Sequence, residues 1–204
     1  KTFALTKGST SVSYTAGGSE TVNDTITALA TAPGPAAIAI IRLSGSDARR
    51  ILAAVVRPHR PGAWRNRQVR YGHVIAADGS VIDEVLAFFI RAPYTYTGED
   101  IAEISCHGGA VAVQLVIARV ISAGARLANP GEFTMRAFLA GKKDLTQAEA
   151  VLGVIDARSE SDLKQALTQL AGGLATPLKA LREDLLNLLA DIEAALDFVD
   201  EDIE

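Results

Sequence analysis

The spacing of apolar residues changes near residue 142, and this change limits the folds available to the chain. Between residues 24 and 127, short β-branched runs alternate with stretches whose apolar positions recur every three or four residues. From residue 142 onward only the three-to-four spacing is found. Strands repeat with a period of two and helices with a period of 3.6. The chain is therefore predicted to be α+β, with a mixed β-sheet domain followed by an α-helical bundle segment.

The first part of the chain contains clear turn signals. Asp78-Gly79 separates two apolar runs and predicts a hairpin with a type I′ turn. Asp47 is placed to cap a short helix that follows it, and Gly141 is placed to end another. The expected strands are residues 36–43, 69–75, 81–90 and 101–106, and the longer expected helices are residues 111–121 and 133–140.

The helical part contains three expected segments. Thr146 and Glu149 form a capping-box pair at the start of the first segment, and Thr176 suits the N-cap of the third. The apolar residues of the third segment alternate spacings of three and four, which indicates a packing seam rather than a functional site. The members of this seam are Leu178, Leu181, Leu185, Leu188, Ile192, Ala195 and Val199.

The two ends differ from the middle of the chain. Residues 1–23 are rich in Thr, Ser and Gly, so we expect an extension outside the folded domain, with at most a loose strand in residues 7–15. Five acidic residues between positions 197 and 204 oppose the macrodipole of the last helix. We therefore expect the chain to be part of a longer protein.

Composition excludes several classes of protein. No apolar run reaches the roughly 20 residues of a membrane helix, and the N-terminus lacks a secretory signal, so a cytoplasmic protein without membrane contact is expected. Cys106 is the only cysteine, so no internal disulfide can form. The net charge of −4 argues against indiscriminate nucleic-acid binding but permits a local basic patch.

The stretch GEDIAEISCHGG, residues 98–109, looks the most reactive. A Cys-His nucleophile needs the thiol and the imidazole within hydrogen-bond reach. Cys106 and His107 are neighbours on an expected strand and would point to opposite faces, so Cys106 is expected to be a small buried residue. No CxxC or HxxxH spacing supports a metal site. Gly141-Lys142 is not followed by Ser or Thr, so the 204 residues contain no phosphate loop of the GxxxxGK[ST] type.

Glu103 is a better binding candidate within the same stretch. On the expected strand it shares a face with Ile101 and Ser105. A carboxylate beside apolar side chains can accept two parallel hydrogen bonds from a planar amino-amide edge, such as that of a pterin or a guanine. The alternative is a solvated glutamate on an edge strand.

Residues 57–70, RPHRPGAWRNRQVR, are a second candidate for binding. Five arginines lie close in sequence to His59 and Trp64, a composition that RNA-contacting surfaces use for charge and base stacking. The alternative is a solvated loop broken by proline.

An ordered set of motifs covers residues 24–204. They are DTI (24–26), APG (32–34), AIAIIRLSG (37–45), TGEDIAEISCHGG (97–109), RLANPGEFTMRAFLAGKKDLTQAEAV (126–151), DARSE (156–160) and DFVDEDIE (197–204). In this order the chain resembles the MnmE family of tRNA-modification GTPases, also called TrmE.

The resemblance implies an architecture. Residues 24–141 would be an N-terminal domain related to folate-binding domains of the glycine-cleavage T-protein kind, which binds 5-formyl-tetrahydrofolate and forms a homodimer. Residues 142–204 would be the first part of a helical domain, cut before an inserted G domain. GTP, magnesium and potassium would bind only in that absent G domain, so this chain alone is expected to have no GTPase activity.

The resemblance also implies a function for the longer protein. With the FAD-containing partner MnmG, the family uses GTP hydrolysis and a one-carbon tetrahydrofolate to modify the wobble uridine, position 34, of certain tRNAs. Two alternatives stay open: a stand-alone folate-dependent aminomethyltransferase of the T-protein type, and a non-catalytic interaction module.

Three folate-binding residues follow from the resemblance, namely Arg42, Glu103 and Lys142. Glu103 would bind the amino-amide edge of the pterin, while Arg42 and Lys142 would offer cations to polar or anionic parts of the folate. Taken alone, Arg42 is equally explained as a strand-end surface arginine and Lys142 as a residue beside a helix stop. No residue of the chain is expected to be catalytic or to bind a metal.

Overall fold

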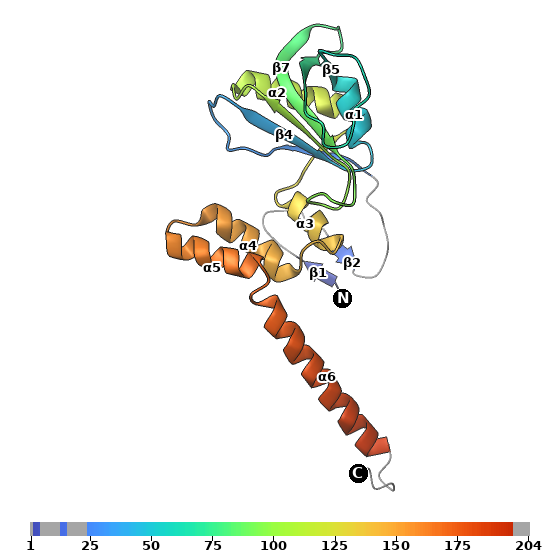
Figure 1. Cartoon of the computed structure of the whole chain (residues 1–204), viewed down its shortest axis with the longest axis vertical. Helices are drawn as coiled ribbons and strands as arrows, with labels where there is room; N and C mark the ends of the chain where they lie inside the picture. The colour runs from blue at the N-terminus through green and yellow to red at the C-terminus, as the bar shows by residue number, and fades with distance from the viewer. Residues whose placement is uncertain (1, 5–12, 16–23, 198–204) are drawn as a thin grey trace.

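The computed structural model describes residues 2–4, 13–15 and 24–197. A mixed β-sheet with two helices forms the upper part of the molecule in Figure 1, three short helices lie beneath it, and one long helix extends away from them. The predicted α+β class, with a mixed sheet followed by a helical segment, is confirmed.

The main sheet has seven strands in the order β5-β6-β7-β8-β4-β3-β9. Neighbouring strands are antiparallel except for β3 and β9, which are parallel. The four strands expected from the sequence correspond to β4, β6, β7 and β8. The strands are β3 (Ile26–Leu29), β4 (Ala39–Ser44), β5 (Val56–Pro58), β6 (Arg70–Ile75), β7 (Val81–Ile90), β8 (Ile101–Cys106) and β9 (Arg126–Leu127).

Two further strands lie in the N-terminal stretch. β1 (Thr2–Ala4) and β2 (Ser13–Thr15) pair antiparallel with each other as a separate two-stranded sheet. Of the strand expected within residues 7–15, the last three residues form β2, whereas residues 5–12 and 16–23 lie outside the described residues.

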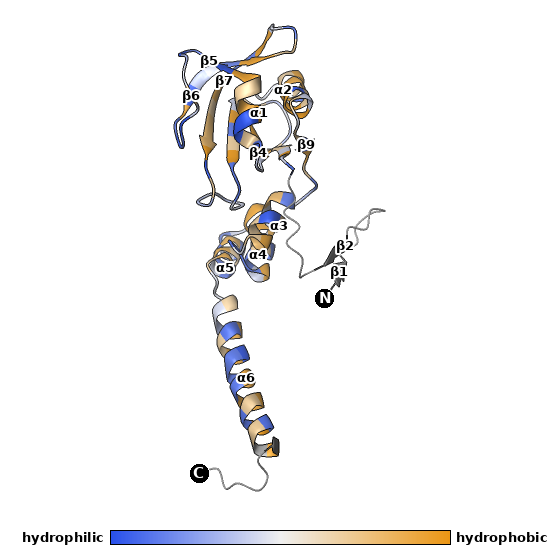
Figure 2. Cartoon of the chain, turned by 90° about the vertical axis from the view of Figure 1, so that its right-hand side faces the viewer, coloured by the Kyte–Doolittle hydropathy of each residue, from blue (hydrophilic) through white to orange (hydrophobic). Residues whose placement is uncertain are grey.

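The hydrophobic core lies between the sheet and the helices α1 (Ala48–Val55) and α2 (Ala110–Ser122). Figure 2 shows both helices on the same side of the sheet. Alternate residues of the central strands point into this core, including Ile41 of β4 and Ile104 of β8, which are fully buried. Because strand side chains alternate, the residues between them face the opposite side, here called the open face. The open face carries Ile40, Arg42, Tyr71, His73, Glu84, Leu86, Phe88, Glu103 and Ser105.

Strands β6 and β7 form the predicted hairpin, but its turn is not type I′. The amide of Gly79 donates to the carbonyl of Ala76, and the amide of Ala76 donates to the carbonyl of Ser80. A type I′ turn needs a positive φ at both central residues, and here Gly79 has a φ of +87° while Asp78 does not have a positive φ. Asp78 accepts hydrogen bonds from the amide and hydroxyl of Ser80, which stabilises the longer turn.

Helix α4 (Leu145–Asp156) begins with a capping box, two residues earlier than predicted. The Asp144 side chain accepts from the amide of Gln147, and the Gln147 side chain accepts from the amide of Asp144. The Thr146 hydroxyl donates to Asp144. The predicted pair of Thr146 and Glu149 is wrong, because the acidic residue immediately before the helix takes the N-cap position.

The remaining helices are α3 (Glu132–Leu139), α5 (Glu160–Leu170) and α6 (Ala175–Asp197). α4 and α5 pack against each other, whereas α6 projects away as a single rod (Figure 1). α6 begins at Ala175, so Thr176 lies inside it instead of capping it. None of the described helices is long and apolar enough to cross a membrane.

The predicted packing seam of α6 has no other helix against it among the described residues. Its side chains are therefore about half exposed, namely Leu178, Leu181, Leu185, Leu188 and Ile192. The last residue of the predicted seam, Val199, and most of the acidic end lie in residues 198–204, outside the described residues.

Candidate functional site

Arg42 and Glu103 lie directly opposite each other on the neighbouring strands β4 and β8. The Nε of Arg42 donates a hydrogen bond of 2.6 Å to Oε1 of Glu103. β8 lies between β7 and β4, so Glu103 is on a central strand, and its side chain is only 14% exposed. The alternative of a solvated glutamate on an edge strand is therefore wrong. Arg42 is likewise an ion-paired residue and not a free surface arginine.

Apolar side chains flank this ion pair on the open face. Phe88 of β7 is opposite Glu103, and the next row across the sheet contains Leu86, Ser105 and Ile40. Side chains in the same or adjacent rows of one sheet face are within contact distance of each other. Within residues 24–197, Oε2 of Glu103 and the two terminal nitrogens of the arginine have no hydrogen-bond partner. A ligand could therefore bond to both members of the pair.

A hollow of about 220 Å³ adjoins this row on the open face. Its lining includes Ile38, Tyr71, Leu86, Ser105 and His107. The hollow is shallow and mostly apolar, with a few polar groups at its edge, which is the usual composition of a small-molecule site.

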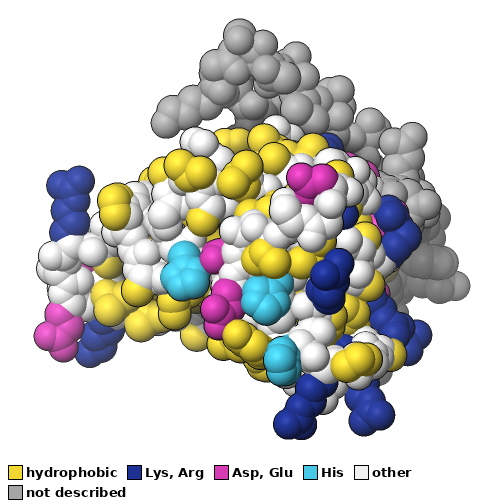
Figure 3. All heavy atoms as spheres, turned by 90° about the horizontal axis from the view of Figure 1, so that it is seen from above, with side chains coloured by type: hydrophobic (Ala, Val, Ile, Leu, Met, Phe, Trp, Pro, Cys, Tyr) yellow, Lys and Arg dark blue, Asp and Glu magenta, His cyan; other side chains and the backbone are white. Residues whose placement is uncertain are grey.

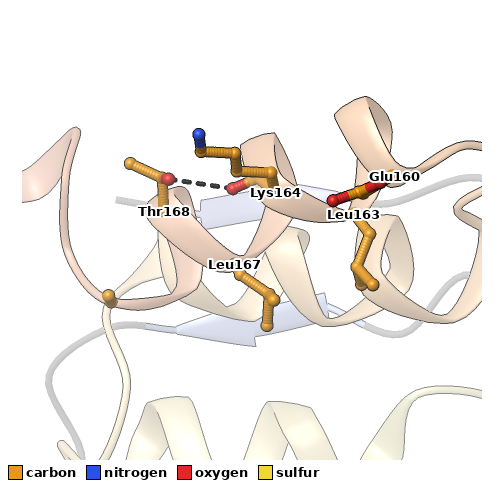
Figure 4. Close-up of a pocket in the computed structure, with 6 residues that line it drawn as sticks. Glu160, Leu163, Lys164, Leu167 and Thr168 are labelled. Atoms are coloured by element: carbon orange, nitrogen blue, oxygen red, sulfur yellow. Dashed lines mark hydrogen bonds between the residues drawn. The ribbon is translucent and has the colours of Figure 1, made fainter.

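A second hollow, of about 490 Å³, lies along α5 (Figure 4). Leu163 and Leu167 point to the same side of the helix, and the Thr168 hydroxyl donates to the carbonyl of Lys164 within it. Every lining residue belongs to α5 or to its C-terminal end. Among the residues that the structure describes, no second element lines this surface, so we do not place the ligand site there.

Lys142 lies beside residues 91–100, the loop that joins β7 to β8. A Cβ added to Gly98 in this loop would be 3.3 Å from the Cε of Lys142. Gly98 has a φ of +80°, a conformation that residues with side chains rarely adopt, so glycine permits this close approach. The Nζ of Lys142 is 6.0 Å from the centroid of the Tyr94 ring. Among the described residues no contact joins Lys142 to Arg42 or Glu103. Of the three predicted residues, Arg42 and Glu103 are therefore paired, whereas Lys142 lies against the loop of residues 91–100.

Hydrogen bonds connect this loop to the strand of Arg42. Ser44 is two residues after Arg42 on β4, and its hydroxyl donates to Glu99 over 2.6 Å. The hydroxyls of Ser44 and Thr97 are 2.7 Å apart, and both residues are fully buried. The loop of residues 91–100 therefore closes one end of the open face.

Arg136 on α3 is the centre of an ionic network that the sequence pattern did not predict. Its terminal nitrogens lie 2.6 Å from Asp24, 3.1 Å from Glu99 and 3.1 Å from Glu132. Arg126 also donates to Glu132 and Asp24. Arg136 and Glu132 are 6% and 4% exposed. In the sequence, the (i, i+4) spacing of Glu132 and Arg136 is the only pattern that indicates any part of this ionic network.

The network keeps its members charged. Burial raises the pKa of Glu132, but hydrogen bonds from Arg126, the Asn129 amide and Arg136 outweigh burial and lower this pKa to about 2. Burial also raises the pKa of Asp24, and bonds from the same two arginines again lower it overall. Because the network joins the start of β3, the loop and α3, it fixes the covered end of the open face.

Cys106 and His107 point apart, as predicted. Cys106 is 3% exposed, and burial, followed by the charge of Asp83, raises the pKa of its thiol to about 11. His107 is exposed, and its Nδ1 lies 2.7 Å from Oδ1 of Asp83, which raises the pKa of the imidazole. The thiol is buried in the core whereas the imidazole is exposed, and no hydrogen bond joins them among the described residues, so the imidazole is not placed to activate the thiol.

Trp64 does not contribute to the stacking surface that the sequence predicted for residues 57–70. Trp64 is 6% exposed and packs in the hydrophobic core. The guanidinium of Arg70 lies 5.4 Å from the Trp64 ring centroid and donates to three carbonyls of the same loop. Both residues thus stabilise the loop. Among the described residues, no three His, Cys, Asp or Glu side chains are close enough to hold a metal ion.

Comparison with known proteins gives two adjacent family matches. The model described as "GTP-binding protein TrmE N-terminus" matches residues 25–142, and the model "MnmE helical domain" matches residues 145–204.

Curated relatives named tRNA modification GTPase MnmE match the same region. The protein of Chloroflexus aurantiacus is 55% identical over 183 residues, which are 90% of this chain and 40% of that protein. The protein of Moorella thermoacetica is 50% identical over 184 residues, covering 88% and 40%. The protein of Roseiflexus castenholzii is 49% identical over 182 residues, covering 89% and 39%. The chain thus spans about 40% of the length of these relatives, and it belongs to the MnmE (TrmE) family of tRNA-modification GTPases.

Proposed function

We propose that this chain binds 5-formyl-tetrahydrofolate on the open face of its sheet and supplies folate binding and dimerisation to a longer tRNA-modification GTPase. The observation that supports this most directly is the pair of Arg42 and Glu103. The pair is largely shielded from water, flanked by Phe88, and has one carboxylate oxygen and two guanidinium nitrogens without a partner among residues 24–197. These groups match the donors and acceptors of a folate.

Each of the three residues has a separate role in this proposal. Glu103 accepts hydrogen bonds from the amino-amide edge of the pterin, because an ionised carboxylate is an acceptor only. Arg42 orients Glu103 through its Nε and donates from its terminal nitrogens to a polar group of the ligand. Lys142, on the loop side, offers a cation to the glutamate tail of the folate.

The domain division follows from the same proposal. Residues 24–141 form the folate-binding and dimerising domain, residues 142–204 the first part of the helical domain, and residues 1–23 an extension. Exposed apolar side chains on and beside the open face, including Ile38 and Leu86, are suitable for contact with a second copy.

The remaining chemistry belongs to parts of the family protein outside this chain. GTP, magnesium and potassium would bind in the G domain, and MnmG with its FAD would be the partner in modifying the wobble uridine, position 34, of tRNA. This chain contributes no catalytic residue to GTP hydrolysis in the proposal.

Calorimetric titration of the chain with 5-formyl-tetrahydrofolate tests the proposal. We expect binding by the parent chain and at least ~10-fold weaker binding by Glu103→Ala, since donors left unpaired in a buried site cost roughly 1–3 kcal/mol. Asp47→Ala is the control, because Asp47 is a half-exposed carboxylate at the start of α1, on the side of the sheet opposite the open face, and its ion-pair partner is Arg50. The control should bind like the parent.

Two outcomes would count against the proposal. Equal affinity in the parent and Glu103→Ala would remove Glu103 from the site. Absence of binding by the parent chain would favour the alternative of an interaction module without folate.

A further inference from the structure

We propose that Arg57, Arg60, Arg65 and Arg67, here called the arginine ridge, bind the phosphate backbone of RNA. The choice of RNA as ligand depends on the proposed role in tRNA modification. No residue of the ridge contacts Arg42, Glu103 or Lys142 in the part of the chain that is described, although Arg67 and Lys142 both lie against Tyr94.

The guanidinium groups of the ridge are exposed and lack acidic partners. All four residues are exposed, and residues 57–70 contain no Asp or Glu. Among the described residues none of the four forms an ion pair, and only Arg67 has a side-chain hydrogen bond, to the carbonyl of Tyr94 over 3.3 Å. Four positive charges within residues 57–67 raise the local potential, and an anionic ligand would neutralise it.

Several other arginines of this chain bond to carboxylates or backbone carbonyls that hold elements of the fold together. Arg126 and Arg136 bind carboxylates in the ionic network, and Arg119 donates to the backbone carbonyls of Ile75 and Ala54. Within the loop itself, Arg70 has such a structural role. Arg57, Arg60 and Arg65 have no such partner among residues 24–197, and unlike the exposed Arg158 and Arg182 of the helices they lie within nine consecutive residues that contain no acidic side chain.

The loop that holds the ridge is fixed by three anchors. Trp64 is buried in the core, and the Arg70 guanidinium donates hydrogen bonds to three backbone carbonyls of the loop. The amide of Arg67 donates to the carbonyl of Phe89 over 2.7 Å, which holds Arg67 at a φ of +60°. A non-glycine residue with this φ is uncommon and needs such support. The guanidinium groups are therefore presented from a preorganised backbone, which lowers the entropy cost of binding.

The neighbouring features favour RNA over an acidic peptide. β5 is the edge strand of the sheet and contains Pro58, which lacks an amide hydrogen, so this edge is poorly suited to an added peptide strand. His59 and Tyr71 lie beside Arg57, with ring centroids 5.8 Å apart, and both are exposed to solvent. Aromatic rings next to guanidinium groups suit the bases and phosphates of a single-stranded loop. Figure 3 shows dark-blue basic side chains along the left, right and lower edges of a face on which histidines also lie.

Fluorescence anisotropy with an unmodified tRNA transcript, measured over a range of salt concentrations, tests the inference. We expect the triple variant Arg57→Gln, Arg60→Gln, Arg65→Gln to bind at least ~10-fold more weakly than the parent at about 0.1 M salt. Each lost phosphate contact lowers the slope of log affinity against log salt by about 0.7–0.9, so the slope should fall by roughly 2–3. The matched control is Arg158→Gln, Lys164→Gln, Arg182→Gln, which removes three exposed charges from the helices and should change affinity less than ~2-fold.

The outcomes separate this inference from the proposed function. Parent-like affinity and slope in the ridge variant, or no tRNA binding by the parent chain, would overturn it. Displacement of tRNA by polyglutamate at equal charge concentration would also overturn it, in favour of an acidic protein partner. Titration of the same ridge variant with 5-formyl-tetrahydrofolate should give the parent affinity, so a failure of folate binding would be seen independently.

Discussion

Arg42 and Glu103 are 61 positions apart in the sequence and 2.6 Å apart in the structure, joined by a single hydrogen bond from Nε to Oε1. The pairing of β4 with β8 brings them together as directly opposed residues. Within residues 24–197 only the Nε of Arg42 forms a hydrogen bond. The pair therefore links the two strands and still has donors and an acceptor for a ligand. The proposed folate site depends on this double role.

Arg42→Gln should weaken binding of 5-formyl-tetrahydrofolate by roughly 10- to 100-fold, since a charge-assisted hydrogen bond is worth about 1.5–3 kcal/mol. Calorimetry on Arg42→Gln, Glu103→Gln and the double variant measures this effect. Because the two residues are in contact, the losses should not add. Arg50→Gln on α1, an exposed pair with Asp47, is the control and should bind like the parent. Fully additive losses would show that the two side chains contact the ligand independently.

Arg136→Met should destabilise the fold by about 3–5 kcal/mol, because it leaves buried carboxylates without their cation. The expected effect is large since Arg136 is 6% exposed and contacts Asp24, Glu99 and Glu132. Urea unfolding followed by circular dichroism measures the change. Arg50→Met, which removes an exposed ion pair, should unfold close to the parent midpoint. Equal midpoints for the two variants would mean that the network does not stabilise the fold.

The lowered pKa of Glu132 predicts a loss of stability in acid. A carboxyl whose folded pKa is depressed stabilises the fold above its unfolded pKa, and the contribution is lost as the pH falls through the folded pKa. For Glu132 this window extends from about 4.5 down to about 2, and the difference corresponds to on the order of 3 kcal/mol. Unfolding free energies of the parent and Glu132→Gln should differ most near pH 7 and converge toward pH 2. A constant difference across this range would contradict the assignment.

Helices and strands with a clear periodic pattern of apolar residues could be predicted from the sequence. Short strands that form only because a neighbouring strand bonds to them could not. β7, β8 and α2 follow from alternation or helical spacing bounded by glycine or aspartate. β3, β5 and β9 contain only four, three and two residues, too few for a period to be visible. They are strands because neighbouring strands bond to them. The turn at Asp78 and the cap at Asp144 were misplaced because a nearby carboxylate accepted backbone donors in a competing local arrangement.

In the candidate site, too, the features that depend on local sequence pattern were predictable and those that depend on strand pairing were not. Alternation along β8 was enough to place Glu103 on one face and Cys106 on the other. Its pairing with Arg42 depends on strand register, which no spacing within either segment specifies. Asp24 and Arg136 are 112 positions apart, so their contact could not be predicted from sequence spacing. Trp64 was assigned to a surface because its neighbours are charged, whereas its large apolar ring is buried.

The contact of His107 with Asp83 predicts a pH-dependent ion pair. The hydrogen bond and the charge of Asp83 raise the pKa of His107, so the stabilisation is present below the ordinary value of 6.5 and is lost as the pH rises through the raised value. NMR titration of the His107 ring protons should give a lower pKa in Asp83→Asn than in the parent. Asp47→Asn, which removes the charge of a carboxylate paired with Arg50 instead, should leave the His107 titration unchanged. Identical titrations in the parent and Asp83→Asn would show that the imidazole does not sense this carboxylate.

Cys106 should be chemically silent in the native protein. Its thiol is 3% exposed and has a pKa of about 11, so at pH 8 very little thiolate exists and reagents cannot reach it. Ellman's reagent should therefore react slowly with the folded chain and should label one thiol per chain in guanidinium chloride. Cys106→Ala should keep the parent affinity for 5-formyl-tetrahydrofolate, because the residue packs in the core on the side of the sheet opposite Glu103. Rapid labelling of the folded chain, or loss of folate binding in Cys106→Ala without unfolding, would contradict a purely structural role for this cysteine.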